Sequence, residues 1–189
     1  FTALSDIVHV RSLKKTTHGI VISKLDYPVS TNEKKILARE VLARRGEILF
    51  SRALILCEGM TEEQIIPAMF EVFFNGYSLF SLGISCISVG GKGYTPFVKL
   101  ACSLGIPTFI ISDNDGTTKT EVESQIKKLT DEELPLTTNN FGSSFYGNTN
   151  DIEAELLNVL KMRNEINEAF ILYETDATEN TQYMCILIA

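Results

Sequence analysis

The fold is decided by three apolar runs that each end in a turn: ALILC before EGMTEE (residues 53–63), ISCISV before GGKG (84–93) and TFIIS before DNDG (108–116). Short, uninterrupted apolar runs are typical of strands that are covered on both faces of a parallel sheet. A helical pattern follows each turn. Three βα units in succession therefore predict an α/β protein with a mainly parallel sheet, right-handed crossovers and flanking helices.

The segments outside these units give weaker patterns. Before them, the sequence predicts short strands at 7–10 and 19–23, then a helix with a basic outer face that is N-capped by Thr31 and ends at Gly46. Thr61 is expected to cap the helix that follows the first run. After the third run we expect a helix at 121–129, a polar loop at 135–150, a helix at 151–163 and edge strands at 170–173 and 184–189.

The composition limits the chemistry that the chain can perform. Its 189 residues include four cysteines without C-x-x-C spacing and only two histidines. This predicts reduced thiols in a cytoplasmic protein, and metal binding through oxygen ligands, which favours Mg²⁺ or Mn²⁺ over zinc. The net charge of −7 argues against binding nucleic acid by bulk electrostatics alone. No apolar run is long enough to span a membrane.

Acidic residues follow two of the runs, where ligands of parallel sheets bind. Glu58 and Glu62 follow the first run, and Asp113 and Asp115 follow the third. A protein-bound divalent ion needs several converging carboxylate oxygens, which one βα turn rarely supplies and two neighbouring strand ends can supply. The pattern predicts a metal site built from these four residues.

Each signal also has a structural interpretation. Glu62 can serve as a first-turn glutamate that the helix dipole favours, and Asp113 and Asp115 can form an Asx turn. The glycine-rich turn at 90–93 can be only a tight turn, or it can contact a phosphate through Gly91 and Lys92. We regard Thr61 as a cap and not as a catalyst.

The order of these motifs resembles a known family. The sequence EGMTE, then VGGKG, then GIP and DNDG, each in its strand or helix context, is similar to the Toprim domain of OLD-family (overcoming lysogenization defect) nucleases across roughly residues 47–117. The resemblance implies a Toprim, Rossmann-like fold with an N-terminal connector of two short strands and a helix (1–52), followed by a Toprim nuclease domain (53–189) whose core motifs lie at 53–117.

The resemblance also implies roles for individual residues. Glu58, Asp113 and Asp115 correspond to catalytic metal ligands, Glu62 to a further ligand, and Asp151 or Glu153 to a later acidic ligand. Two Mg²⁺ or Mn²⁺ ions would hydrolyse a DNA phosphodiester, one activating water and the other stabilising the leaving oxygen. The family's phosphate-stabilising lysine has no clear counterpart, because the only lysine after residue 153 is Lys161.

The family context extends beyond this chain. An ATPase usually precedes this Toprim domain, yet no Gly-x-x-x-x-Gly-Lys-Ser/Thr motif occurs here. We therefore expect the chain to be part of a longer protein, with ATP bound only by a domain outside it. The resemblance further implies DNA as substrate, a homodimer or higher homo-oligomer, a role in anti-phage defence and a defence-system partner. It does not distinguish nicking from double-strand cleavage.

Two other functions compete with the nuclease. Residues 113–117 also fit the Asp-x-Asp-x-Thr motif of haloacid-dehalogenase-type phosphatases, in which Asp113 would be the nucleophile. That motif normally opens its domain, and the phosphatase leaves the Glu58 motif unexplained. The second alternative is a non-catalytic Toprim scaffold that mediates oligomerisation.

Overall fold

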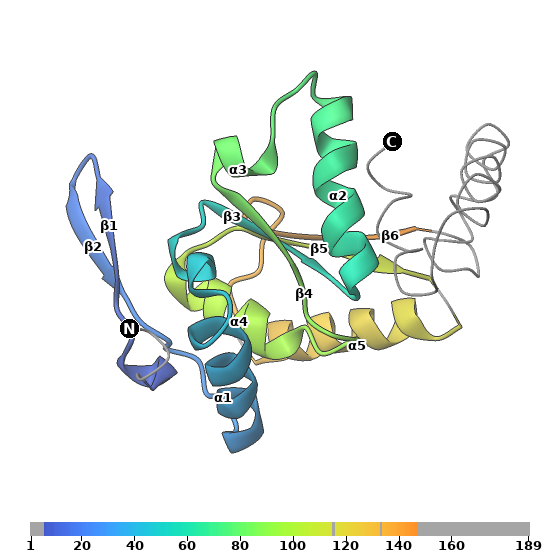
Figure 1. Ribbon diagram of the computed structural model, residues 1–189. Helices are drawn as coiled ribbons and strands as arrows, with labels where there is room; N and C mark the ends of the chain where they lie inside the picture. The colour runs from blue at the N-terminus through green and yellow to red at the C-terminus, as the bar shows by residue number, and fades with distance from the viewer. Residues whose placement is uncertain (1–5, 115, 133, 147–189) are drawn as a thin grey trace, which may run out of the picture.

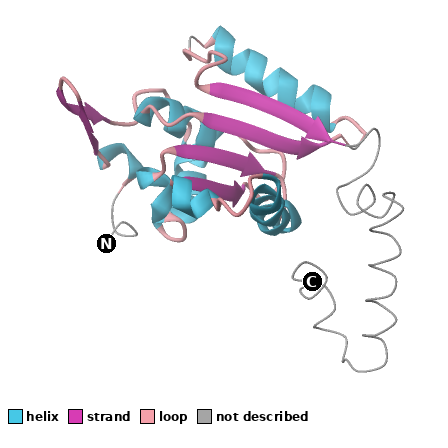
Figure 2. Ribbon diagram, turned by 90° about the horizontal axis from the view of Figure 1, so that it is seen from above, coloured by secondary structure: helices cyan, strands magenta, loops and turns pink. Residues whose placement is uncertain are grey.

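The computed structural model describes residues 6–114, 116–132 and 134–146. Its centre is a parallel sheet with the strand order β4 (Ile84–Ser88), β3 (Ala53–Cys57), β5 (Thr108–Asp113) and β6 (Phe141–Tyr146). Figure 1 shows α2 (Met60–Phe73) and α3 (Leu79–Leu82) on one face, with α4 (Thr95–Leu104) and α5 (Thr118–Asp131) on the other. The predicted α/β fold with a parallel sheet is confirmed, and Figure 2 shows the four strands side by side.

The main hydrophobic core lies between the sheet and the α4/α5 layer. Alternate strand residues point to opposite faces, and Leu54, Leu56 and Ile110 are almost fully buried against Phe97 and other core residues. On the α2 face the preceding residue of β5, Phe109, remains 41% exposed. Burying an aliphatic side chain contributes about 1.5–3 kcal/mol, so this layer supplies much of the folding free energy.

Residues before β3 belong to the same core. Ile7, Leu37, Val41 and Ile48 are buried in one cluster with the sheet residues. The core is therefore continuous across residues 52 and 53. The division into a connector and a Toprim domain at that point stays a prediction.

The N-terminal region differs in detail from the sequence-based expectation. Ile7–His9 is a 3-10 helix and not a strand, because the Asp6 side chain caps it. The two strands are β1 (Ser12–Thr16) and β2 (Gly19–Ser23), an antiparallel hairpin that projects from the rest of the molecule in Figure 1. The strand expected at 19–23 is confirmed. The strand expected at 7–10 was wrong, and β1 was not predicted.

The first helix also begins and ends differently. Ser30, not Thr31, is the N-cap of α1 (Thr31–Leu37), because Ser30 and Glu33 form a reciprocal capping box. The helix does not continue regularly to Gly46. It passes into a π-helical turn (Ala38–Leu42), and a 3-10 helix (Gly46–Phe50) leads to β3.

Four further expectations were wrong. The N-cap of α2 is Gly59 and not Thr61, since the Glu62 carboxylate accepts the Gly59 N–H. Helix α5 is longer than the expected 121–129, and α3 was not predicted. The expected loop at 135–150 contains strand β6, whose Phe141 and Phe145 pack against the core. The helix expected at 151–163 and the strands at 170–173 and 184–189 lie outside the described residues.

The cysteines that the structure describes are free thiols, as expected: Cys57, Cys86 and Cys102. A hydrogen bond with Cys86 and burial both raise the pKa of Cys57, which keeps this thiol protonated and unreactive. Within the described ranges, no helix is both long and apolar enough to cross a lipid bilayer.

Candidate metal and nuclease site

The carboxyl ends of β3, β4 and β5 meet at one edge of the sheet. Strand β3 lies between the other two, in parallel register with both. Glu58 follows β3, Asp113 ends β5 and the 89–93 turn follows β4. The two acidic motifs, which are far apart in sequence, therefore lie at neighbouring strand ends.

The Glu58 carboxylate is held from the α4 side of the sheet. The Ser112 hydroxyl donates to Glu58 Oε2 at 3.3 Å, and the Tyr94 hydroxyl donates to Ser112 Oγ at 3.1 Å. Tyr94 is buried, and this burial raises the pKa of its phenol, which therefore stays a donor at neutral pH. Two hydroxyl groups in series thus orient Glu58 without neutralising its charge.

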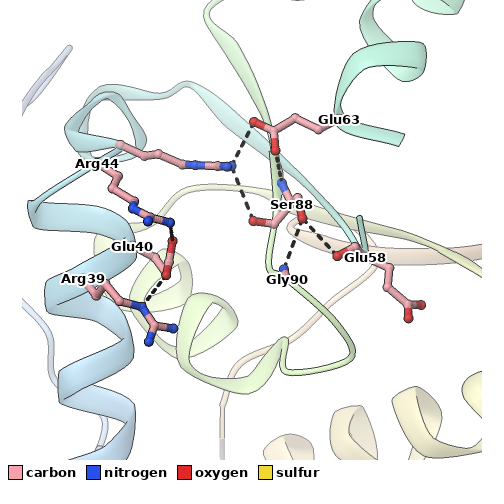
Figure 3. A network of polar contacts seen from close by, with 8 residues as sticks. Arg39, Glu40, Arg44, Glu58, Glu63, Ser88 and Gly90 are labelled. Atoms are coloured by element: carbon pink, nitrogen blue, oxygen red, sulfur yellow. Dashed lines mark hydrogen bonds and ion pairs between the residues drawn. The ribbon is translucent and has the colours of Figure 1, made fainter. Parts of the chain in front are cut away.

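A second network fixes the backbone at Glu58 (Figure 3). The Glu58 carbonyl accepts the Ser88 hydroxyl at 3.0 Å and the Gly91 N–H at 2.9 Å, and Ser88 Oγ also accepts the Gly90 N–H at 3.1 Å. The Glu58 carboxylate extends away from this network in Figure 3. These hydrogen bonds connect the turn after β3 to the glycine turn after β4. They use only the backbone carbonyl of Glu58, so its carboxylate can contact Ser112.

Arg45 anchors this network to the N-terminal region. Its guanidinium lies 2.9 Å from Glu63 Oε1 and donates to the Ser88 carbonyl at 3.4 Å, while Glu63 Oε2 accepts the Ser88 N–H at 2.9 Å. Glu63 is thereby neutralised by an arginine, which marks it as a structural glutamate. Two other arginines of this region, Arg39 and Arg44, pair with Glu40 (Figure 3). The hydrogen bond from Arg39 is the main cause of the lowered pKa of Glu40.

Glu62 is buried on the α2 side, with 6% of its surface exposed. Its Oε2 accepts the Gly59 N–H at 3.0 Å, and its Oε1 accepts the Tyr146 hydroxyl at 2.7 Å. A Cβ at position 59 would lie 2.8 Å from Glu62 Oε2, so only glycine leaves room for this folded-back carboxylate. The position of Glu62 therefore depends on Gly59 and on a residue 84 positions later in the chain.

Asp113 lies on the same face of the sheet as Glu62. It is 7% exposed and pairs in register with Tyr146 of β6. Ser112 precedes it and points to the opposite, α4-facing side, because successive strand residues alternate between faces. The acidic edge thus has two sides, with Glu58 held by Ser112 on one and with Glu62 and Asp113 on the other.

These carboxylates suit a hard divalent cation by their chemistry. Glu62 and Asp113 are buried, and every carboxylate supplies oxygen atoms, the ligands that such cations prefer. The groups that donate hydrogen bonds to Glu58 and Glu62 are uncharged hydroxyl or N–H groups. Across residues 6–114, 116–132 and 134–146, however, no group of three or more His, Cys, Asp or Glu side chains is gathered closely enough to hold an ion. Asp115, which we expect to complete the set, lies outside the described residues, as do Asp151 and Glu153.

The backbone of the glycine turn hydrogen-bonds within the protein. Gly90 and Gly91 have φ angles of 70° and 120°, which only glycine adopts readily. The Gly91 N–H, through which we expected a phosphate contact, donates to the Glu58 carbonyl. The Lys92 carbonyl accepts the Gln125 side chain at 2.8 Å, so α5 holds the turn in place. A phosphate contact by the Lys92 side chain stays a prediction.

Several residues that shape this edge were not predicted from the sequence: Arg45, Glu63, Ser88, Tyr94, Ser112 and Tyr146. Ser112 directly precedes Asp113, and Ser88 is the next-to-last residue of the second run, so both positions were available as strand-end signals. Tyr146 lies in a polar segment that gave no strand pattern, and only its pairing with β5 reveals its place.

Comparison with known proteins agrees with this arrangement. Residues 49–115 match the family model described as "Overcoming lysogenization defect protein-like, TOPRIM domain". The chain contains a Toprim domain of the OLD family. The match includes both acidic motifs in their observed strand context. It favours the Toprim interpretation over the phosphatase, which accounts for only one of them.

Two relatives extend the comparison. The protein "Endonuclease GajA" of Bacillus cereus (strain HuB5-5) is 25% identical over 175 residues, which is 92% of this chain and 24% of that protein. The chain therefore spans about a quarter of the length of this curated relative. The solved C-terminal region of the OLD protein of Xanthomonas campestris pv. campestris matches 70% of this chain and 68% of its own, with 27% identity and a TM-score of 0.50.

Proposed function

We propose that this chain is the nuclease portion of a DNA endonuclease that depends on Mg²⁺ or Mn²⁺. The observation that carries the proposal is the position of Glu58 and Asp113 at the ends of the neighbouring strands β3 and β5, with Glu62 in the first turn of α2, within an OLD-family Toprim domain. The name of the GajA relative supports endonuclease chemistry. ATP binding elsewhere in a longer protein, a role in anti-phage defence and a defence-system partner are further parts of this proposal.

The residues have distinct tasks in the proposed reaction. Glu62 and Asp113 would hold one side of the ion site and Glu58 the other, with Asp115 completing it. Bound divalent ions would supply an activated water and would stabilise the departing oxygen of the phosphodiester. Ser112 and Tyr94 orient the Glu58 carboxylate through two hydroxyl groups in series. Lys92 would contact a DNA phosphate.

The proposal is tested on supercoiled plasmid with the full chain. We expect nicked or linear product with Mg²⁺ or Mn²⁺, none with excess EDTA, and none with Glu58→Gln. Glu123→Gln, an exposed change on α5, is the matched control and should leave cleavage intact. A small phosphomonoester assayed in parallel separates the phosphatase, because only the nuclease requires Glu58. Cleavage by a well-folded Glu58→Gln variant at the normal rate would refute the nuclease, and a wild type that binds ions without cutting would favour the scaffold.

We also propose that the chain forms a homodimer through an aromatic surface on α2 and α3. Its members are large, exposed apolar side chains: Met69, Val72, Phe73, Phe74, Tyr77 and Phe80, which are 45–92% exposed. Residues 72–91 contain no charged side chain. Two copies with a net charge of −7 repel one another over most surfaces, and this uncharged face lets them meet with the least repulsion.

The area of this surface suits such an interface. At about 150–250 Å² for each aromatic side chain, its four rings expose on the order of 500 Å². Two copies would then bury on the order of 1,000 Å², near the lower limit for a specific interface. A patch of this size is among the largest that a monomer usually exposes, and such patches often have a binding role.

Light scattering coupled to gel filtration tests the dimer. We expect wild type at twice the chain mass, and the double variant Phe73→Ser with Phe80→Ser at one chain mass. Leu13→Ser, on the separate β1–β2 hairpin and 65% exposed, should stay dimeric. A wild type of single-chain mass at high concentration, or a double variant that remains dimeric, contradicts this interface.

A further inference from the structure

Tyr146 joins the last strand of the sheet to the first helix of the site. It is the last residue of β6, lies beside Asp113 in the parallel register and donates its phenolic hydrogen to Glu62 Oε1 at 2.7 Å. Glu62 is on α2, so this single contact links α2, β6 and the end of β5. Strand β6 lies at the edge of the described sheet. The apolar pattern of the sequence does not predict a strand there.

The chemistry of this contact differs from that of the other glutamates in the same region. Glu63, the next residue, faces the Arg45 guanidinium at 2.9 Å, and Glu33 faces the Lys99 ammonium at 3.4 Å. Both of the donors observed on Glu62, the Gly59 N–H and the Tyr146 hydroxyl, are uncharged. A carboxylate has about four lone-pair positions, so these two hydrogen bonds fix its orientation and leave both its charge and further acceptor capacity.

Burial removes both carboxylates on this face from water, a setting in which a bound cation would be strongly favoured. Glu62 is 6% exposed and Asp113 is 7% exposed, and both lie on the same face of the sheet edge. Two buried carboxylates of like charge repel one another, and each loses the solvation that water would give it. A phenol can hold such a group in one position, whereas an arginine would also remove the charge that attracts an ion.

We propose that Tyr146 is a positioning residue for the ion site, holding the Glu62 carboxylate beside Asp113 in a binding orientation. The inference rests on the proposed metal-dependent function. Tyr146 acts through Glu62 and contacts neither the ion nor the DNA. Hydrogen bonds to metal ligands typically govern metal affinity by about 10–100-fold, so losing this one should affect ion binding before it affects anything else.

The test uses Tyr146→Phe in the full chain, which removes only the hydroxyl. Mn²⁺ binding without DNA is measured by calorimetry, and plasmid nicking is titrated against Mn²⁺ with each variant. We expect Mn²⁺ to bind about 10-fold more weakly, with the nicking rate restored at saturating Mn²⁺. Tyr27→Phe is the matched control, because it removes a hydroxyl that contacts Cys102 near the end of α4, away from the acidic edge, and this variant should bind Mn²⁺ as wild type does.

A double-mutant cycle separates positioning from a general structural role. In the Glu62→Gln background, Tyr146→Phe should weaken Mn²⁺ binding no further, because its effect passes through the carboxylate. Wild-type Mn²⁺ affinity in Tyr146→Phe, or an equal additional loss in the Glu62→Gln background, overturns this inference alone. A wild-type chain that binds no Mn²⁺ and nicks no plasmid overturns the proposed function and this inference with it.

Discussion

Replacing Asp113 by asparagine should lower the rate of plasmid nicking by about 10²–10⁴-fold. Asp113 ends β5 beside Glu62 and Tyr146, and its carboxylate is buried at the proposed ion site. Metal ions stabilise transition-state charge by several kcal/mol, and each 1.36 kcal/mol corresponds to a factor of ten in rate. Asparagine keeps the shape of the side chain while removing one negative charge, so the loss should reflect ion binding and not a collapsed fold.

Two measurements make this result specific. Thermal unfolding of Asp113→Asn should show a melting temperature no lower than that of wild type, because the change relieves the repulsion between two buried carboxylates. Asp131→Asn, an exposed position at the end of α5, should nick plasmid at the wild-type rate. A folded Asp113→Asn protein that retains nicking would remove Asp113 from the site and would leave the proposed function without one of its main supports.

Replacing Lys99 by methionine should lower the free energy of unfolding by about 3 kcal/mol at pH 7. Lys99 is buried in α4, where its ammonium lies 3.3 Å from Glu132 and 3.4 Å from Glu33 and donates to the Pro28 carbonyl at 3.1 Å. Methionine keeps the length and apolar stem of the side chain. The cost arises because Glu33 and the Pro28 carbonyl lose their partner in a poorly solvated place.

The same contact should make stability depend on acid. Burial is the largest single influence on the pKa of Glu33 and raises it, but the Ser30 N–H, the Ser30 hydroxyl and the Lys99 ammonium together bring it below its ordinary value of 4.5. A lowered folded-state pKa contributes stability that is fully present above about pH 4.5 and is lost as the pH falls through the folded-state value. The Lys99→Met difference should therefore shrink below about pH 4.5.

Urea unfolding at pH 7 and at a series of lower pH values checks this prediction. Lys24→Met is the matched control, because Lys24 pairs with Asp26 at the surface, where both side chains are more than half exposed. Such a pair contributes about 0–1 kcal/mol, so its loss should scarcely change the midpoint. A Lys99→Met midpoint equal to that of the control would mean that Glu33 and Glu132 are well solvated without their lysine.

Much of the fold was predictable because its signals are local. Leu54 and Leu56 alternate with partly buried neighbours in an apolar run, and Ile110 does the same, so strands β3 and β5 follow from hydrophobic patterning. The prediction failed where a neighbour in space decides the structure. Strand β6 is rich in glycine and serine, and it becomes a strand by hydrogen bonding to β5 while Phe141 and Phe145 reach the core. Its Gly142 is required because the Phe109 ring lies over it, where a Cβ would approach within 2.6 Å.

The sequence by itself determined the parallel βα architecture and the acidic residues that end its strands, because hydrophobic periodicity and strand-end chemistry act over a few neighbouring residues. The tertiary structure alone decided which partners those acids have: Ser112 for Glu58, Tyr146 for Glu62 and Arg45 for Glu63. Adjacent, chemically identical glutamates thus differ in role, one neutralised by an arginine and one held by a phenol. That difference comes from groups up to 84 positions away, which only the packing of sheet and helices brings together.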